Sequence, residues 1–516
     1  MPNLTTPNSL APSLRADRAE PVRYPLQRPL FKAGCLIGLL GGALCGSLVV
    51  GFSLAVAAWL AGLLWREDEL PVQVFCVLYQ WVFIVTGYYA YLYYGYHPAH
   101  IVLGNIESAV VVSLIGLIAV SLGIRTAMPN TYNPRLAVGN ITEKSEVEYD
   151  PRKLFWIVIC LFTVNWLMET FPMAILFDAA QIIHSIFLFR YLFLLVLLMV
   201  IVRQRTGYQY GALAFLFVLM PEFTSGMAKF KDVFFMVLIV FVAYWKPWSK
   251  DPRYRTRNRQ VFVVSVSLCV VILAAGLVWT GGMKGDWRTA LRTGTVSGSP
   301  IEKIEEFGRH LDRSIQKFDS NTALQAFLAR LSSSEGYFSR VLSIVPERVP
   351  HEDGALTWRA IHHILTPRLL FPEKKNLGGD SWLVRKYASV QVAGDESSTS
   401  VGLGYMAEFY IDFGTPWMFI PLFILGLLIG SMQGIFRKIS PSPYIAEAAV
   451  TGLLIQHFIG YGSHLTKMIG GLLESSAIFV ICIVVAGRWL HGHIQFRAPA
   501  NKTKHLKASV AYKLDV

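Results

Sequence analysis

Long apolar stretches recur along the chain and are separated by short polar or charged segments. A helix needs about 20 mostly apolar residues to cross the roughly 30 Å hydrocarbon core of a membrane. Ten stretches approach or reach this length and predict membrane-spanning helices, although the fifth and sixth are short. They are residues 71–94, 101–123, 154–177, 184–202, 208–220, 233–245, 261–281, 405–430, 444–459 and 465–486.

An eleventh stretch, residues 31–65, is too long for one ordinary span and short for two. Its glycines, Gly41, Gly42, Gly46 and Gly51, would permit a tight hairpin. Cytoplasmic loops are enriched in Lys and Arg, and the basic segments from Arg125 onward alternate with the spans. An even number of spans before that point also places the basic N-terminal tail in the cytoplasm. The sequence therefore predicts eleven or twelve spans, with twelve spans and two cytoplasmic termini favoured.

The composition agrees with a membrane protein. Hydrophobic residues make up 53% of the 516 positions and charged residues only 16%, below the roughly 25% of soluble proteins. This excludes a disordered chain and disfavours a soluble globular enzyme. The net charge of +13 lies mostly in tails and cytoplasmic loops, so it indicates orientation rather than nucleic-acid binding. Six cysteines, all within apolar stretches, exclude a disulfide scaffold and show no metal-ligand spacing.

One hydrophilic segment, residues 282–403, interrupts the series of spans and has the composition of a soluble protein. The charge alternation places it outside the cytoplasm. Apolar residues at helical spacing predict an amphipathic helix within 301–331. A structured loop of this size suggests chemistry or recognition rather than an inert cap. The predicted organisation is a cytoplasmic tail (1–30), membrane helices (31–281), a large extracytoplasmic loop (282–403), C-terminal membrane helices (404–487) and a basic cytoplasmic tail (488–516).

Ionisable residues in or near the apolar stretches gather in the predicted outer half of the membrane. Charge at membrane depth is costly and marks functional candidates, although each residue alone could equally be an interface anchor or an internal pair. The layout suits an anionic, lipid-linked substrate with its head group at the outer interface. These residues are Arg190, Glu222, Lys229, Lys231, Asp232, Glu408, Asp412, His457, His464, Lys467 and Glu474.

A run of motifs joins the large loop to the next apolar stretch. Arg368 and Lys374 lie in a Pro-Arg…Pro-x-Lys patch, and a small polar patch and the pattern G-x-x-x-E-x-Y-x-x-F-G follow, with Glu408 as its acid. Residues 366–430 resemble the oligosaccharide repeat-unit (O-antigen, Wzy-type) polymerase family. Residues 224–229 are similar to the Ser-Gly-Arg/Lys patch of that family, with an extra residue before Lys229 and Lys in place of Arg.

The resemblance implies an all-α polytopic membrane glycosyltransferase of the GT-C type at the outer face of the bacterial inner membrane. Its reaction would join oligosaccharide repeat units carried on undecaprenyl diphosphate, which is the leaving group. The implied partners are this lipid-linked oligosaccharide, membrane lipid, a chain-length regulator and a flippase. No nucleic acid, cofactor or metal is expected.

The implied reaction gives roles to the candidate residues. A hydroxyl that attacks an anomeric carbon needs a base within hydrogen-bond reach, and Glu408 is the first candidate, with His363 and Glu396 in reserve. The structural alternative for Glu408 is a pair with Lys467 or a place at a helix N-terminus. Cations would stabilise the departing diphosphate. The candidates are Arg368, Lys374, Arg190, Lys229 and Lys467.

Three other function classes stay open at the level of sequence. An O-antigen ligase shares the implied fold, donor and loop, and the patch from Glu408 to Gly414 favours a polymerase over it. A flippase or other transporter would predict paired half-repeats, whereas no simple internal repeat is visible. A non-catalytic scaffold of a polysaccharide machine would leave the cations dispensable.

Overall fold

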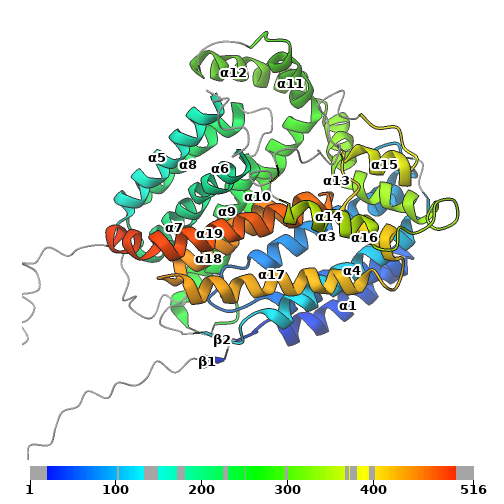
Figure 1. Ribbon diagram of the computed structural model, residues 1–516, viewed down its shortest axis with the longest axis horizontal. Helices are drawn as coiled ribbons and strands as arrows, with labels where there is room; N and C mark the ends of the chain where they lie inside the picture. The colour runs from blue at the N-terminus through cyan, green and yellow to red at the C-terminus, as the bar shows by residue number, and fades with distance from the viewer. Residues whose placement is uncertain are drawn as a thin grey trace, which may run out of the picture.

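The computed structural model is a bundle of helices (Figure 1). It describes residues 20–21, 23–101, 104–132, 149–170, 180–224, 230–249, 251–296, 300–366, 371, 380–393 and 401–495. Two short strands, β1 (Glu20–Pro21) and β2 (Thr131–Tyr132), pair antiparallel. The helices of the first half are α1 (Gln27–Cys45), α2 (Leu48–Leu64), α3 (Val72–Tyr94), α4 (Ile106–Ala127), α5 (Pro151–Thr170), α6 (Ala180–Phe187), α7 (Phe189–Gln204), α8 (Tyr208–Thr224) and α9 (Phe230–Ala243).

The second half of the chain begins with a long apolar helix, α10 (Pro252–Val278). A five-residue π-helical turn, η3 (Trp279–Met283), continues it. The remaining helices are α11 (Lys284–Arg292), α12 (Pro300–Gln316), α13 (Ser320–Leu342), α14 (Ala355–Leu365), α15 (Ser381–Tyr387), α16 (Tyr405–Phe413), α17 (Phe419–Ile439), α18 (Pro443–His457) and α19 (Leu465–Ile494).

Among the described residues, eight helices are long and apolar enough to cross a membrane. The prediction of a helical membrane protein is therefore confirmed at this level. Two further apolar helices, α2 and the first part of α8, are shorter than a full span. The short helices α9 and α18 are almost entirely buried inside the bundle. The predicted total of eleven or twelve spans stays a prediction.

The expected hairpin in residues 31–65 is present as α1 and α2. Gly46 ends α1 in the left-handed conformation (φ 61°), and the Ser47 hydroxyl accepts a hydrogen bond from the Val50 N–H at 3.3 Å. A Cβ on Gly38 would lie 2.7 Å from the Gly51 carbonyl oxygen. The two helices therefore pack backbone to backbone, which only glycine permits at these positions.

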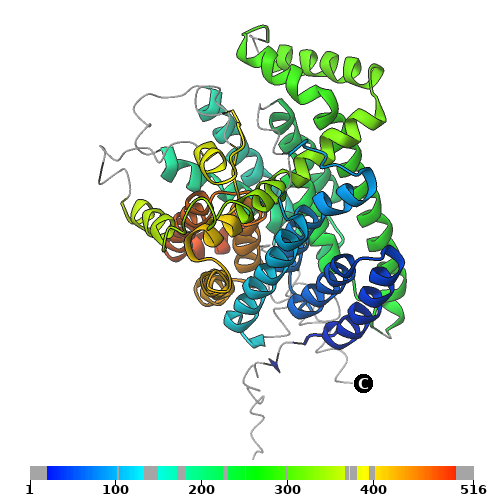
Figure 2. The ribbon, with the colours of Figure 1, turned by 90° about the vertical axis from the view of Figure 1, so that its right-hand side faces the viewer.

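Helix α4 lies between the hairpin and α17 (Figure 2). The contact between α4 and α17 is close because glycines face each other across it. A Cβ on Gly123 would overlap the Phe423 carbonyl, and a Cβ on Gly426 would overlap the Val120 carbonyl. This is the small-residue packing common between membrane helices, where backbones approach closely without side chains between them.

A buried polar network ties α17 and α18 to the connection between α2 and α3. The Glu69 carboxylate pairs with Arg437 at 2.7 Å and Arg66 at 3.3 Å, and it accepts a hydrogen bond from Gln433 at 2.8 Å. Arg437 also pairs with Glu447 at 2.8 Å. Both glutamates are 5% exposed, so the network is desolvated and each charge needs its partners. The sequence did not predict this network.

The prediction of one continuous apolar helix over residues 405–430 is wrong, because the chain breaks between α16 and α17. Gly414 ends α16 at φ 62°, and Pro416, which has no N–H to donate, follows in the turn. The short helix α16 is held by the start of α14. There the Asp412 carboxylate accepts hydrogen bonds from the backbone N–H groups of Leu356 (2.9 Å) and Thr357 (2.7 Å).

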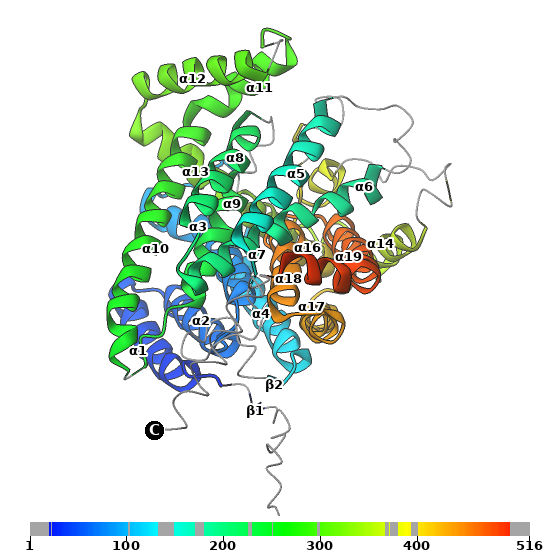
Figure 3. The ribbon, with the colours of Figure 1, turned by 90° about the vertical axis from the view of Figure 1, so that its left-hand side faces the viewer.

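The predicted amphipathic helix within 301–331 is two helices, α12 and α13. Asp319 separates them because its carboxylate accepts the Thr322 N–H at 2.9 Å and caps α13. Figure 3 shows α11 and α12 lying across the end of α10. In contrast, α13 packs against α3 and α4 within the bundle. Part of the segment 282–403 is therefore built into the helical body, and its extracytoplasmic side stays a prediction.

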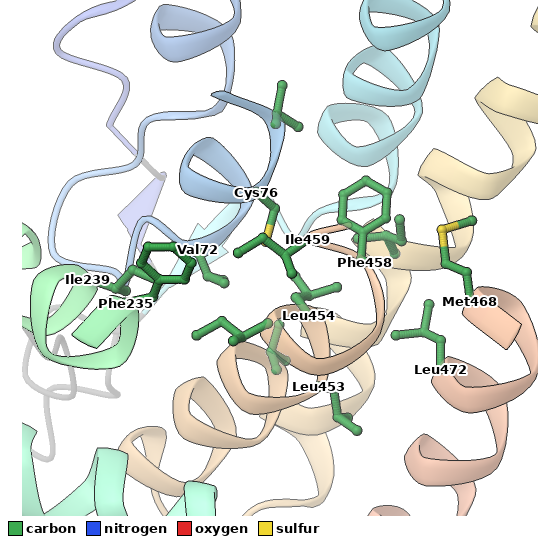
Figure 4. Packing of buried hydrophobic residues seen from close by; sticks show 14 of the residues in the cluster. Val72, Cys76, Phe235, Ile239, Leu453, Leu454, Phe458, Ile459, Met468 and Leu472 are labelled. Atoms are coloured by element: carbon green, nitrogen blue, oxygen red, sulfur yellow. The ribbon is translucent and has the colours of Figure 1, made fainter. Parts of the chain in front are cut away.

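The hydrophobic core lies where α3, α9, α18 and α19 meet (Figure 4). Its side chains include Cys76, Phe235, Leu454 and Leu472, all buried. All six cysteines are free thiols within candidate membrane helices, as their positions in apolar stretches indicate. They act as small apolar residues in these helices.

Candidate functional site

Glu408 lies in the first turn of α16 and is only 2% exposed. Its Oε1 accepts a hydrogen bond from the backbone N–H of Leu465, the first residue of α19, at 3.1 Å. Its Oε2 lies 3.7 Å from Nε2 of His464. The structural alternative for Glu408 was a place at a helix N-terminus. Glu408 lies in the first turn of its own helix, α16, and it also accepts a hydrogen bond at the N-terminus of α19, which begins much later in the chain.

His464 precedes α19 as its N-cap. Its Nδ1 accepts the backbone N–H of Thr466 at 3.1 Å. In a neutral imidazole the other nitrogen then carries the proton, so Nε2–H faces the Glu408 carboxyl. From the sequence, His464 is one of several charges predicted at the outer face. It lies next to Glu408 because the Glu408 carboxyl accepts a hydrogen bond from the first residue of α19, which directly follows His464.

Burial controls protonation of both groups. Burial raises the pKa of Glu408 well above its usual value, Asp380 and Asp412 raise it further, and the Leu465 N–H and Arg359 oppose the rise. Burial also lowers the pKa of His464, to about 4. A carboxyl of raised pKa is, when ionised, a stronger base than an exposed one.

A small, largely enclosed pocket adjoins Glu408 and His464. It is built from four segments of the chain that are distant in sequence, namely α14, α15, α16 and the start of α19. The Arg359 guanidinium stacks over the Trp382 ring at 4.7 Å. A carboxyl, an imidazole and a guanidinium thus converge on one cavity. Its lining residues are Leu356, Arg359, Trp382, Leu383, Glu408, His464 and Thr466.

Lys467 lies one turn beyond His464, and its side chain is 61% exposed. Its ammonium pairs with the Asp380 carboxylate at 2.6 Å, next to the pocket. The structural alternative of a Glu408–Lys467 pair is therefore not what the structure shows. Lys467 pairs with Asp380, and Glu408 contacts the backbone at the start of α19. Lys467 retains an exposed position where it can meet an anionic ligand.

His363 lies in the last turn of α14, half-buried, and its charge influences that of His464. It therefore belongs to the surroundings of the pocket. Arg190 does not. It is 2% exposed in α7, where its guanidinium donates to Asn165 of α5 and to the Tyr191 hydroxyl and lies over the Phe162 ring. Arg190 therefore joins α5 to α7 inside the bundle.

Four predicted site residues lie outside the described residues. They are Lys229, Arg368, Lys374 and Glu396. Within the part of the chain that the structure describes, no group of three His, Cys, Asp or Glu side chains could hold a metal ion. The candidate site therefore rests on the Glu408 pocket.

A second buried carboxyl, Glu335 of α13, was missed by the sequence reasoning. It is fully buried, accepts hydrogen bonds from the Tyr461 and Ser113 hydroxyls, and has a pKa raised by burial to about 8. Ser334 beside it packs against Gly462, in the same connection that carries His464. The connection between α18 and α19 therefore contacts two buried carboxyls, Glu335 through the Tyr461 hydroxyl and Glu408 through the Leu465 N–H. No local signal marks Glu335, because it lies in a polar stretch.

Neither any curated protein nor any solved structure matches the chain. One family model matches residues 83–438, which extend from within α3 to the end of α17. This range contains Glu408, Arg359 and Glu335, whereas His464 lies beyond it. The match covers more than half of the chain, so the protein belongs to the family described as a domain of unknown function, DUF8712.

Proposed function

We propose that this membrane protein is a polymerase of lipid-linked oligosaccharides. It would join repeat units carried on undecaprenyl diphosphate into a surface polysaccharide at the outer face of the bacterial inner membrane. The observation that carries the proposal is the pocket in which Glu408, His464 and Arg359 converge. This pocket lies where the polar segment 282–403 meets the C-terminal membrane helices, which suits a substrate with a sugar head and a lipid tail.

In the proposed reaction, a hydroxyl of one repeat unit attacks the anomeric carbon of the sugar attached to diphosphate. The Glu408 carboxylate accepts the hydroxyl proton while the new C–O bond forms. The bond between the anomeric carbon and the diphosphate oxygen breaks, and the diphosphate leaves with the electron pair. His464 Nε2–H faces the carboxyl and keeps it oriented. Because Glu408 is almost fully buried, the pocket must widen for the acceptor to enter.

Cations favour departure of the diphosphate because they stabilise charge that develops on it. Arg359 lines the pocket, and Lys467 is exposed near it. Arg368 and Lys374, assigned to the diphosphate by the resemblance, remain part of the proposal. Arg190 is omitted, since its guanidinium is engaged inside the bundle by Asn165 and Tyr191.

Complementation of a gene deletion tests this function. The wild-type gene should restore long surface polysaccharide, whereas Glu408→Gln at equal protein level should leave single repeat units. Glu352→Gln is the matched control, because Glu352 is a partly exposed acid that pairs with Lys386 at 2.7 Å. Normal polymer with Glu408→Gln contradicts the proposal. In the deletion strain, polymer trapped on the carrier would indicate a ligase, and repeat units trapped on the cytoplasmic face would indicate a flippase.

The proposed orientation places both termini in the cytoplasm and the segment 282–403 outside. Cysteine labelling in a cysteine-free background tests it. Ser320 is exposed at the start of α13 and should be labelled from outside as Ser320→Cys, whereas Ser249→Cys should be protected. The reverse labelling pattern would overturn the orientation.

A further inference from the structure

The connection between α18 and α19, residues 458–464, is held between two other segments of the chain. A Cβ on Gly462 of this connection would lie 2.3 Å from Oγ of Ser334 in α13. On the other side, a Cβ on Gly402 would lie 2.2 Å from the Gly462 carbonyl oxygen. Both contacts are too close for a side chain in place of the glycine. The connection is therefore packed between α13 and the residues that lead into α16, the helix that carries Glu408.

Tyr461 of this connection places its hydroxyl between α4 and α13. The hydroxyl donates a hydrogen bond to Oε2 of Glu335, and it lies 2.9 Å from Oγ of Ser113 in α4. The Ser113 Oγ is in turn 3.1 Å from Oε1 of Glu335. All three residues are buried. Three oxygen-bearing side chains from three segments thus form a closed triangle that is shielded from water.

The triangle satisfies all of its protons when Glu335 is neutral, a state that burial favours. The carboxyl O–H can then donate to Ser113, the Ser113 O–H to Tyr461, and the Tyr461 O–H to the second carboxyl oxygen. A buried donor or acceptor that loses its partner destabilises the fold. The amide of Gln offers a donor and an acceptor at the same places, whereas Leu offers neither. Glu335→Gln should therefore preserve the triangle, and Glu335→Leu should break it.

The same connection ends at the contacts of Glu408. The Leu465 N–H donates to Oε1 of Glu408, and the Thr466 N–H donates to Nδ1 of His464, each at 3.1 Å. The first four N–H groups of a helix have no acceptor within that helix. These two amides therefore depend on the Glu408 and His464 side chains. A shift of Tyr461 would move the start of α19 and weaken both hydrogen bonds.

We propose that Glu335 is a positioning residue for the Glu408 site. Through Tyr461 it holds the connection that places His464 and the Leu465 N–H against the Glu408 carboxyl. Glu335 does not line the pocket itself, so it acts through Tyr461. Its effect on catalysis rests on the proposed function, whereas its effect on the geometry of the site does not.

Hydrogen exchange in the purified full-length protein at pH 6.5 tests the geometry without any assay of activity. Glu335→Leu should speed exchange of the Leu465 and Thr466 amides by about tenfold or more, because the start of α19 is released. Tyr461→Phe removes the hydroxyl but keeps the ring, and it should have the same effect. Glu335→Gln should exchange as the wild type does. Wild-type exchange at Leu465 in both Glu335→Leu and Tyr461→Phe would overturn the proposal, and Tyr461→Phe decides alone if Glu335→Leu does not fold.

Two controls separate positioning from a general loss of stability. The Leu356 and Thr357 amides begin α14 and donate to Asp412, which lies on the same helix as Glu408. Their exchange should not change in either variant, and equal acceleration at α14 and α19 would overturn the proposal. Tyr244→Phe is the matched variant, because the buried Tyr244 hydroxyl donates to the Met199 carbonyl at 3.2 Å. It should leave exchange at the start of α19 unchanged, and acceleration there would also count against the proposal.

Chain extension then tests the catalytic consequence. Tyr461→Phe should lower kcat by about tenfold and change KM by less than about twofold, because the pocket lining is intact while the Glu408 contacts are loosened. Glu335→Gln, the conservative variant, should recover most of the rate that Glu335→Leu loses. Faster exchange at α19 together with normal polymer from Glu408→Gln would refute the proposed function alone. Unchanged exchange with a polymerase that depends on Glu408 would refute the positioning role alone.

Discussion

Replacement of Glu335 by Gln should remove a specific pH dependence from the stability of this protein. The Glu335 carboxyl is fully buried, and the groups that act on it are the Tyr461 and Ser113 hydroxyls. Burial raises its pKa from 4.5 to about 8, so the folded state holds the proton more tightly than the unfolded chain does. The stabilisation is therefore fully present below about pH 4.5 and is lost as the pH rises through about 8.

The size of this effect follows from proton linkage. Between pH 6.5 and 8 the folded state keeps a proton that the unfolded state has released, which lowers the free energy of unfolding by ~1.4 kcal/mol per pH unit, or ~2 kcal/mol in total. The titration of His97 and His464 does not change the stability within this pH window. Burial lowers the pKa of each to about 4, so their contribution to stability rises with pH below about 6.5 and is constant above it.

Chemical denaturation in detergent at pH 6.5 and pH 8 measures the effect. The wild type should lose ~2 kcal/mol more than Glu335→Gln over this interval, because the amide keeps an acceptor for Tyr461 but does not titrate. Glu352→Gln is the control. Hydrogen bonds from Lys386 and Tyr387 hold the pKa of Glu352 below its usual value, so it is ionised throughout the window. Equal pH slopes for the wild type and Glu335→Gln would refute the assignment of a raised pKa to Glu335.

Three further changes test the architecture by equilibrium unfolding or by recovery of monodisperse protein. Glu69→Ala should destabilise by about 3–5 kcal/mol, because it removes the buried carboxylate that pairs with both Arg66 and Arg437 and leaves Arg437 with Glu447 alone; a loss below about 1 kcal/mol would contradict this. Asp412→Ala should lose about 1–2 kcal/mol and expose the start of α14 to proteolysis, since it removes the acceptor there; an unchanged cleavage pattern would contradict it. Gly426→Leu should abolish recovery of folded protein, because its side chain overlaps the Val120 carbonyl; normal recovery would refute the close α4–α17 contact.

The helices that are long and apolar enough to span a membrane were predictable because their signal is local. Continuous apolar stretches predicted the helices, and the glycines of residues 31–65 predicted the hairpin closed at Gly46. The break between α16 and α17 was also marked in the sequence by Gly414 and Pro416. It was missed because the surrounding residues are uniformly apolar and suggest one continuous helix.

The residues that surround Glu408 were harder to predict, because their proximity is created by tertiary structure. Glu408 and His464 are separated in sequence by α17 and α18, and only the return of the chain at α19 brings them within 3.7 Å. Arg190 was predicted to bind substrate because it interrupts an apolar stretch. Its partner Asn165 is on another helix, so the sequence could not distinguish an internal contact from a ligand contact.

Glu335 illustrates a different limit. Its neighbours in sequence are polar, so its position is typical of an exposed loop, yet α13 packs against α3 and α4 and buries it completely. Burial here depends on the small residues Gly87 and Gly336, which allow close contact with Ser332 and His97. These contacts depend on how α13 fits against α3 and α4, so the sequence of any one of these helices does not predict them.

The most direct test of the proposed function is chain extension by the purified protein in lipid vesicles that contain undecaprenyl-diphosphate-linked repeat units. The wild type should lengthen the oligosaccharide and release undecaprenyl diphosphate. Glu408→Gln, folded and able to bind the lipid, should be slower by at least about 100-fold, as expected for loss of a general base. Extension by Glu408→Gln at the wild-type rate, or no release of undecaprenyl diphosphate by the wild type, would contradict the proposal.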